Sequence, residues 1–122
     1  MEKQGVVSIW LGTFASTQLL DEYTFISYDE EDDIKAPFFQ DFRIDLLDVD
    51  DDFMEKEKIE KPSSSLSELL EGVSYDDIIV PQLNSTHLKR SYNTIILLYN
   101  YDYKERLRSV GNVDFIAAVH YK

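Results

Sequence analysis

Cysteine is absent from this 122-residue sequence, and histidine and glycine are scarce. Without cysteine the chain can form no disulfide, and a Cys–His nucleophile is impossible. The two histidines are His87, in a polar stretch, and His120, near the end of the last apolar stretch, and no serine stands in a nucleophile elbow. The four glycines are too scattered for a phosphate-binding loop: Gly5, Gly12, Gly72 and Gly111. We therefore expect no catalytic residue and no enzymatic activity.

Long hydrophobic runs and basic residues are also few. The apolar run within residues 1–14 is too short for a signal peptide or a membrane span. There are 12 Lys and Arg against 24 Asp and Glu, a net charge of −12. Such a charge repels nucleic acid and anionic membranes. We therefore expect a cytoplasmic protein that binds neither.

Acidic residues and aromatic residues are what the sequence has in abundance. With 43% hydrophobic residues, eight Tyr and seven Phe, the chain can bury a proper core. Its length predicts one domain over residues 1–122.

Three stretches have the alternation of strands. The first is Val6–Phe14, with Val6, Ser8 and Trp10 on one face, and Gly12 positioned for close approach of another backbone or a ring. The second is Asn93–Tyr101, whose apolar residues on both faces predict an interior place in the sheet. The third is Val113–Tyr121, which follows a turn at Gly111-Asn112. We expect Trp10, Phe14, Ile95, Leu97 and Phe115 to be buried.

The middle of the chain has the signals of helices. Ser16 can cap a helix over Thr17–Phe25, and Pro37 suits the first turn of a second helix that carries Phe38, Phe39 and Phe42. A third, exposed helix is predicted over Asp50–Glu60, ending before Pro62. Ser65-Leu66-Ser67-Glu68 is a capping box for a fourth helix that ends near Gly72. Tyr75–Val80 fits either a helix face or a short strand, and Lys104–Ser109 a helical turn.

These elements together predict an α+β fold. We expect an antiparallel sheet of at least three strands, with helices from the middle of the chain packed against it.

Residues 21–60, hereafter the acidic segment, carry the whole net charge. They contain 16 acids and four bases, a net of −12, so the rest of the chain is neutral on balance. The acids concentrate in two runs on either side of the phenylalanine cluster. The first acidic run is Asp29, Glu30, Glu31, Asp32 and Asp33, and the second is Asp48, Asp50, Asp51 and Asp52. Because a disordered acidic tail would lack such aromatics, we interpret the segment as a folded surface that faces a basic protein partner. A charged face that only keeps the protein soluble is the alternative.

The second acidic run begins like a calcium-binding loop. Acids stand at its first, third and fifth positions, but Phe53 replaces the required Gly and Ile59 the closing Glu. We therefore expect no metal site and no cofactor.

Three stretches are distinctive when taken together: Val7–Phe14, with Ser8, Trp10, Gly12 and Phe14; Tyr28–Asp45, with the Asp41-Phe42 pair; and Asn93–Tyr103. Together they resemble the bacterial immunity protein 22 family of polymorphic toxin systems. The segment Asp51-Asp52-Phe53 adds to the resemblance. In the family pattern Gly follows the Asp-Phe pair, whereas this chain has Arg43. The chain therefore differs from the family pattern at the turn after this pair.

The resemblance implies a non-enzymatic immunity protein that binds a cognate toxin tightly. Many toxin domains are nucleases with basic clefts, which an acidic surface can occupy as a phosphate mimic. The nine carboxylates of the two acidic runs are then the predicted partner-binding residues. Two alternatives remain: an acidic adaptor or nucleic-acid mimic that binds another basic protein, and a carboxylate-based metal-binding module or enzyme.

Overall fold

The computed structural model describes residues 2–28, 34–49, 53–84, 86–88 and 90–122. In chain order the elements are β1 (Glu2–Gly12), α1 (Thr17–Thr24), β2 (Ser27–Tyr28), β3 (Ile34–Lys35), α2 (Pro37–Asp41), the 3₁₀ helix η1 (Leu46–Asp48), β4 (Met54–Ser63), α3 (Leu66–Leu69), α4 (Asp76–Gln82), β5 (Tyr92–Tyr101), β6 (Ser109–Val110) and β7 (Val113–His120).

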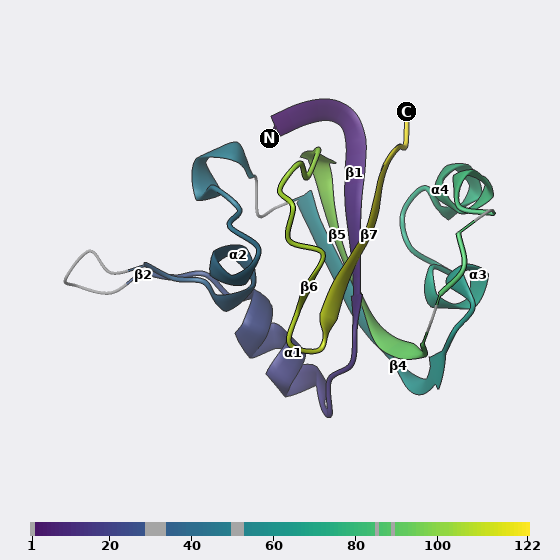
Figure 1. The fold of residues 1–122 in the computed structure, drawn as a ribbon, viewed down its shortest axis with the longest axis horizontal. Coiled ribbons are helices and arrows are strands. Elements are labelled where there is room, and N and C mark those ends of the chain that lie inside the picture. The colour runs from purple at the N-terminus through teal and green to yellow at the C-terminus, as the bar shows by residue number, and fades with distance from the viewer. Residues whose placement is uncertain (1, 29–33, 50–52, 85, 89) are drawn as a thin grey trace.

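A five-stranded antiparallel sheet in the order β4-β5-β1-β7-β6 forms the middle layer. Helices α1 and α2 lie on one side of it and α3 and α4 on the other, and both ends of the chain lie at one end of the sheet (Figure 1). The pair β2-β3 projects away from the sheet. The predicted α+β fold is therefore confirmed.

Strand β1 lies inside the sheet and buries both of its faces. Val7, Ile9 and Leu11 pack toward α3 and α4. Trp10 packs on the opposite side with Phe38 and the rest of the α1 and α2 cluster. Gly12 allows the close approach expected of it, because a Cβ there would lie 3.1 Å from Val113 Cγ2 and 3.3 Å from the Phe14 ring.

Two strands change face partway along. Tyr99 belongs to the α3–α4 side whereas Tyr101 belongs to the α1–α2 side, because Asn100 between them has a φ of 61° and reverses the alternation. In β7, Phe115 and Ala117 likewise face opposite sides, since the pairing with β1 shifts register between them. The expectation that alternation continues through both strands was wrong at these positions.

The buried residues and the first helices agree with the sequence. Trp10, Ile95, Leu97 and Phe115 are buried, whereas Phe14 is only half-buried. Ser16 caps α1, with Leu19 N donating to Ser16 Oγ at 3.2 Å. Pro37 stands in the first turn of α2, and Phe38, Phe39 and Phe42 are buried.

The capping box at α3 is only half formed. Glu68 N donates to Ser65 Oγ at 3.4 Å, but the Glu68 carboxylate accepts from the Ser63 hydroxyl, and Ser65 N donates to Ser63 Oγ. The helix ends at Leu69, before Gly72, whose φ is +86°. Tyr75–Val80, left open by the sequence, is helical: Tyr75 is the N-cap of α4, which begins at Asp76.

Two predicted helices are wrong. The part of Asp50–Glu60 that the structure describes contains no α-helix: after Phe53 it is strand β4, which pairs with β5 from Met54 opposite Leu98 to Ser63 opposite Tyr92. The helical turn predicted over Lys104–Ser109 is an irregular segment with a bend at Arg106 that leads into β6, and the Arg108 guanidinium there lies 5.0 Å from the centre of the Phe115 ring.

Candidate functional site

One of the nine predicted partner-binding residues, Asp48, lies in the described part of the chain. The other eight, residues 29–33 and 50–52, lie outside the described residues. Asp48 is the last residue of η1 and is partly exposed. Burial raises the pKa of Tyr101, and the nearby charge of Asp48 raises it further. Asp48 therefore lies near the end of β5.

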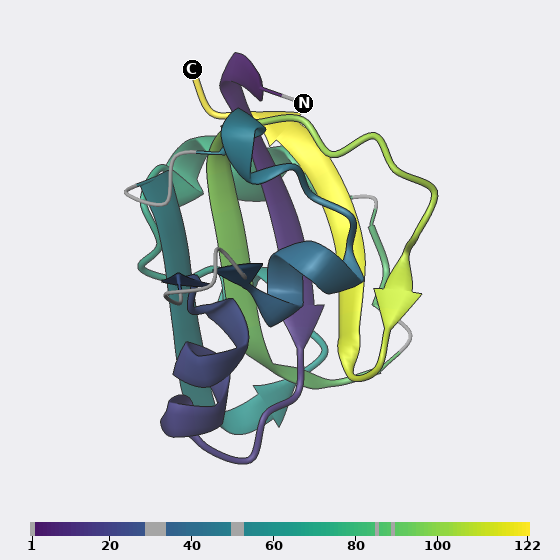
Figure 2. The ribbon, with the colours of Figure 1, turned by 90° about the vertical axis from the view of Figure 1, so that its left-hand side faces the viewer.

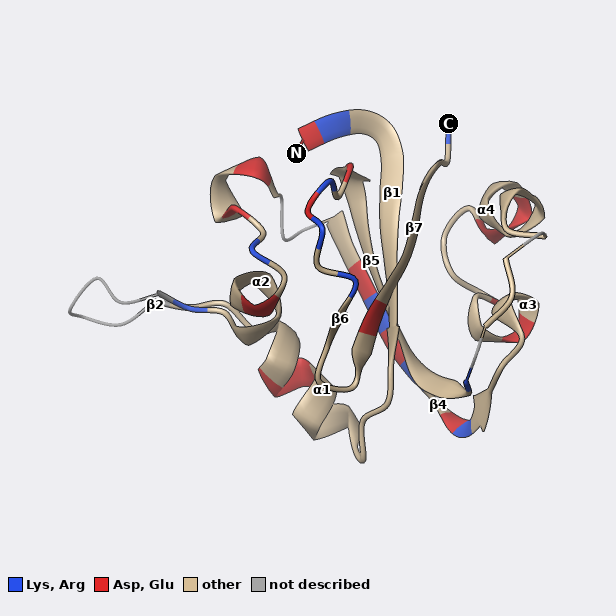
Figure 3. Ribbon diagram, viewed as in Figure 1, with Lys and Arg blue, Asp and Glu red and all other residues tan. Residues whose placement is uncertain are grey.

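The described part of the acidic segment forms the layer on the Trp10 side of the sheet and the edge strand β4. Figure 2 views this layer face on, with α1 and α2 lying across the sheet. Figure 3 colours the positions of Asp and Glu red, and such positions occur on both α1 and α2. Asp21, Glu22, Asp41 and Asp45 are exposed. Between described residues of this segment the structure has one ion pair, Lys56 with Asp21 at 3.5 Å, so most of these carboxylates keep their charge open to solvent.

Phenylalanines attach this charged layer to the sheet. The rings of Phe38 and Phe42 lie 5.0 and 5.9 Å from the Trp10 ring, centre to centre, in edge-to-face contact. Phe38 also contacts Phe39 at 5.1 Å. Because such buried aromatic pairs allow few alternative arrangements, the carboxylates of α1 and α2 are held on a rigid support.

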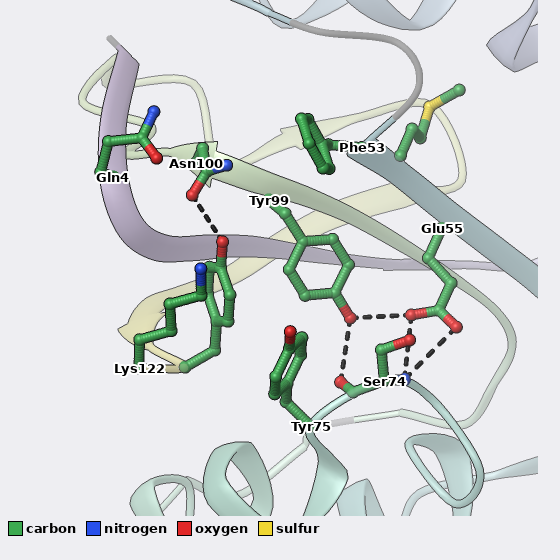
Figure 4. A pocket seen from close by; sticks show the side chains of 10 residues that line it. Gln4, Phe53, Glu55, Ser74, Tyr75, Tyr99, Asn100 and Lys122 are labelled. Carbon is green, nitrogen blue, oxygen red and sulfur yellow. Dashed lines mark hydrogen bonds between the residues drawn. The ribbon is translucent and has the colours of Figure 1, made fainter.

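A hollow of about 530 Å³ opens at the end of the sheet where the two chain ends lie. We call it the tyrosine hollow (Figure 4). Its walls come from β4, β5, the start of α4 and both ends of the chain: Gln4, Phe53, Met54, Glu55, Ser74, Tyr75, Tyr99, Asn100, Tyr121 and Lys122. Phe53 directly follows the second acidic run in the sequence. The acidic segment therefore contributes part of the wall of the hollow, through Phe53, Met54 and Glu55.

Three tyrosines form the aromatic part of the hollow. The Tyr121 ring lies 4.8 Å from the Tyr75 ring and 5.0 Å from the Tyr99 ring, centre to centre. Asn100, in the left-handed conformation, directs its amide oxygen to accept from Tyr121 Oη at 2.5 Å and from Gly5 N at 3.1 Å. Tyr75 is 44% exposed and Phe53 is 49% exposed. The hollow therefore presents aromatic surface to solvent.

Glu55 is the acid inside the hollow. Its Oε1 accepts from Tyr99 Oη at 2.7 Å, and Ser74 N donates to its two oxygens at 3.1 and 3.3 Å. Burial raises the pKa of Tyr99, and the hydrogen bond to Glu55 raises it further, so Tyr99 stays a neutral donor. These bonds connect β4 to the loop before α4 and fix the direction of the carboxylate (Figure 4).

An aromatic hollow with a fixed carboxylate has the features of a binding site. Tyrosine combines a large apolar face with a polar tip, and it is enriched where proteins contact one another. The sequence analysis did not predict this hollow, although the sequence contains the tyrosines that form it, in Tyr99-Asn100-Tyr101 and at Tyr121 near the C-terminus. No local pattern indicates that residues so far apart in the chain meet.

A second polar cluster supports the start of β5. Arg90 Nε donates to Asp114 Oδ2 at 2.9 Å, and the Tyr92 hydroxyl donates to the same oxygen. Burial acts to raise the pKa of Asp114, but hydrogen bonds from Ser109, Tyr92 and Arg90 outweigh it and lower that pKa. The cluster connects β5 to β7 and is an ordinary structural ion pair.

Both histidines are exposed. His87 lies in an exposed loop and His120 is exposed at the end of β7. Across the described ranges no group of three or more His, Asp or Glu side chains is arranged to hold a metal ion. In the same part of the chain, every helix is too short or too polar to span a bilayer.

The comparisons with known proteins identify a family. No curated protein and no solved structure matches the chain significantly. The sequence profile named Immunity protein 22 matches residues 7–122, from the core of β1 to the last residue. Because the match covers essentially the whole chain, this protein belongs to the immunity protein 22 family.

Proposed function

We propose that this protein neutralises a cognate bacterial toxin by binding it directly, without catalysis, through the acidic segment. Membership of the family supports an immunity function and implies a toxin as partner. The partner surface that best fits this segment is a basic one, such as the substrate cleft of a nuclease. The two acidic runs are the proposed charged contacts.

The distribution of charge is the observation that carries this proposal. The acidic segment holds the full net charge of −12, and most of its described carboxylates are exposed, with one ion pair between described residues of the segment. A solubility surface would need no such concentration, because charges spread over the molecule would serve equally well. Concentrated charge instead accelerates encounter with a basic partner and excludes acidic ones.

The buried aromatic residues beneath the charged helix α2 also support the proposal. Phe38, Phe39 and Phe42 are almost fully buried and hold α2 against Trp10. A surface that is ordered before binding loses little conformational entropy when the partner arrives. This is the behaviour that a tight inhibitor needs.

The test is the binding kinetics of charge-neutralised variants with the toxin encoded beside this protein. One variant changes each acid of the first acidic run to Asn or Gln, and another does the same for the four acids of the second run. We expect both to bind more slowly and with a weaker dependence on salt, because Coulomb attraction acts mainly on the association rate. Both should fold normally or become more stable.

A matched control separates position from net charge. Glu2, Glu71, Asp77 and Glu105 are exposed acids outside the acidic segment. Neutralising these four removes the same charge as the second-run variant, and we expect a clearly smaller loss of association rate. If instead both run variants bind like the parent at every salt concentration, the acidic segment is only a solubility surface. The contact should then be sought first around Lys104–Arg108.

A further inference from the structure

We propose that the tyrosine hollow receives an arginine side chain of the toxin. This inference rests on the proposed function and deepens it, because it assigns one specific contact in addition to the general attraction of the acidic segment. The hollow's volume of about 530 Å³ lies within the range of roughly 300–1,000 Å³ typical of ligand pockets. It can therefore admit a long side chain together with part of the peptide that carries it.

The aromatic walls favour a cation. Faces of aromatic rings attract positive charge when it lies within about 6 Å of the ring centre. The chain itself provides an example, since Lys122 Nζ lies 5.6 Å from the centre of the Tyr121 ring. Lys122 is exposed, so a cation from a partner can displace it.

The carboxylate of Glu55 completes the charge complementarity. A carboxylate has about four positions at which it can accept a hydrogen bond. Tyr99 Oη and Ser74 N use some of these and fix the orientation, and Oε2 is contacted only by Ser74 N at 3.3 Å among the bonds between described residues. Oε2 can therefore accept a further donor from a guest.

Arginine fits this combination better than lysine. Its planar guanidinium can stack on a tyrosine face while its N–H groups donate to a carboxylate in the same plane. An ammonium group is a compact, strongly hydrated charge, and it gains less from a flat aromatic wall. Phe53 and Tyr75, both partly exposed at the hollow, can cover the aliphatic part of the guest.

The backbone at Tyr75 gives independent support. Tyr75 has a φ of 63°, an unusual value for a bulky residue, and its side chain makes no capping bond to α4. Strained conformations of this kind concentrate at binding and catalytic sites. Here the conformation places an aromatic ring at the hollow, where Asn or Gly would adopt the same backbone more readily.

The first test uses small peptides and needs no toxin. NMR follows the ring protons of Tyr75 and Tyr121 during titration with acetyl-Gly-Arg-Gly-amide, and with the same peptide carrying citrulline, which has the shape of arginine without its charge. We expect saturable shifts with the arginine peptide, weaker ones with a lysine peptide and none with citrulline. Glu55→Gln should reduce the arginine response. Equal shifts with arginine and citrulline, or no shifts with either, would overturn the inference.

The second test measures dissociation from the toxin. Tyr75→Phe retains the aromatic face, and Tyr75→Leu retains only apolar bulk. We expect Tyr75→Phe to bind like the parent and Tyr75→Leu to raise Kd about tenfold, through faster dissociation. Thermal unfolding of each variant establishes that the fold is kept.

A third test should show tighter binding to the toxin instead of weaker binding. Lys122→Met removes the cation that competes for the hollow and should tighten binding, whereas Lys61→Met removes the same charge from exposed β4 and should tighten it less.

If the toxin binds the parent but the two Tyr75 variants are equal and the two lysine variants are equal, this inference fails and the proposed function stands. If the toxin does not bind the parent, both fail.

Discussion

Arg43 occupies the left-handed backbone region, with a φ of 57°, directly after Phe42, the C-cap of α2. Its N–H donates to the carbonyl of Gln40 at 3.2 Å, and Ile44 N donates to the carbonyl of Phe39 at 2.8 Å. These two bonds define a Schellman motif, in which glycine is preferred at the position of Arg43. The turn therefore forms here although Arg43, rather than glycine, occupies this position.

Replacing Arg43 should reveal the strain at this position. Arg43→Gly and Arg43→Ala remove the same charge, but only Gly adopts a positive φ without cost. We expect the Gly variant to be more stable than the Ala variant by about 1 kcal/mol, a difference measurable by urea unfolding. An Ala variant as stable as the Gly variant would show that this turn does not require the left-handed conformation.

Among the elements, β4 differs most from what the sequence predicts. Glu57 and Lys61 have helical spacing, yet the strand pairs with β5 along the edge of the sheet. Lys56 Nζ lies 2.8 Å from Thr24 Oγ1 and 3.5 Å from Asp21, which connects β4 to α1. Alternating acids and bases on an exposed edge, together with Pro62, discourage pairing with other chains. A polar pattern that protects an edge has no apolar periodicity by which to recognise a strand.

Amide hydrogen exchange distinguishes the two structures of this segment. Along Met54–Lys58 we expect protected and fast-exchanging amides to alternate, because only every second N–H of an edge strand points toward β5. The interior strand β1 is the reference and should protect consecutive amides. Consecutive protection along Met54–Lys58 would instead indicate a helix there.

At the scale of the whole molecule, two cores share one sheet. The core on the α3–α4 side contains aliphatic residues such as Ile9 and Leu97, and that on the α1–α2 side contains Trp10 and its aromatic neighbours. The net charge belongs to the acidic segment, whose helix α2 packs on the second core, whereas the rest of the chain is neutral. We therefore expect mutual repulsion mainly within this segment.

Salt should stabilise the protein by screening this repulsion. The screening length falls to about 10 Å at 0.1 M salt, so raising sodium chloride from 10 to about 300 mM should raise Tm by a few degrees. The second-run variant should gain less from salt than the variant neutralised at Glu2, Glu71, Asp77 and Glu105, which removes the same charge. Calorimetry at both salt concentrations measures this. The same gain in both variants would mean that the repulsion is not local to the acidic segment.

The sequence by itself determined the elements whose signals are local. Apolar alternation indicates strands β1, β5 and β7. Ser16, Pro37 and the phenylalanines indicate helices α1 and α2. These signals are local because residues two to four positions apart share a face of the same element. A count of acidic and basic residues is enough to show that the net charge is concentrated in the acidic segment. The two acidic runs remain a prediction, and Asp48 is their one described member, near the end of β5.

The tertiary structure alone decided what depends on distant partners. Strand β4 exists because β5 provides its hydrogen bonds, and the left-handed Asn100 sends Tyr101 to the opposite core from Tyr99. The tyrosine hollow joins Tyr75, Tyr99 and Tyr121 with Glu55, from elements that meet only when the sheet closes. Local periodicity has no information about pairing between distant segments, so this candidate site became visible only in the folded chain.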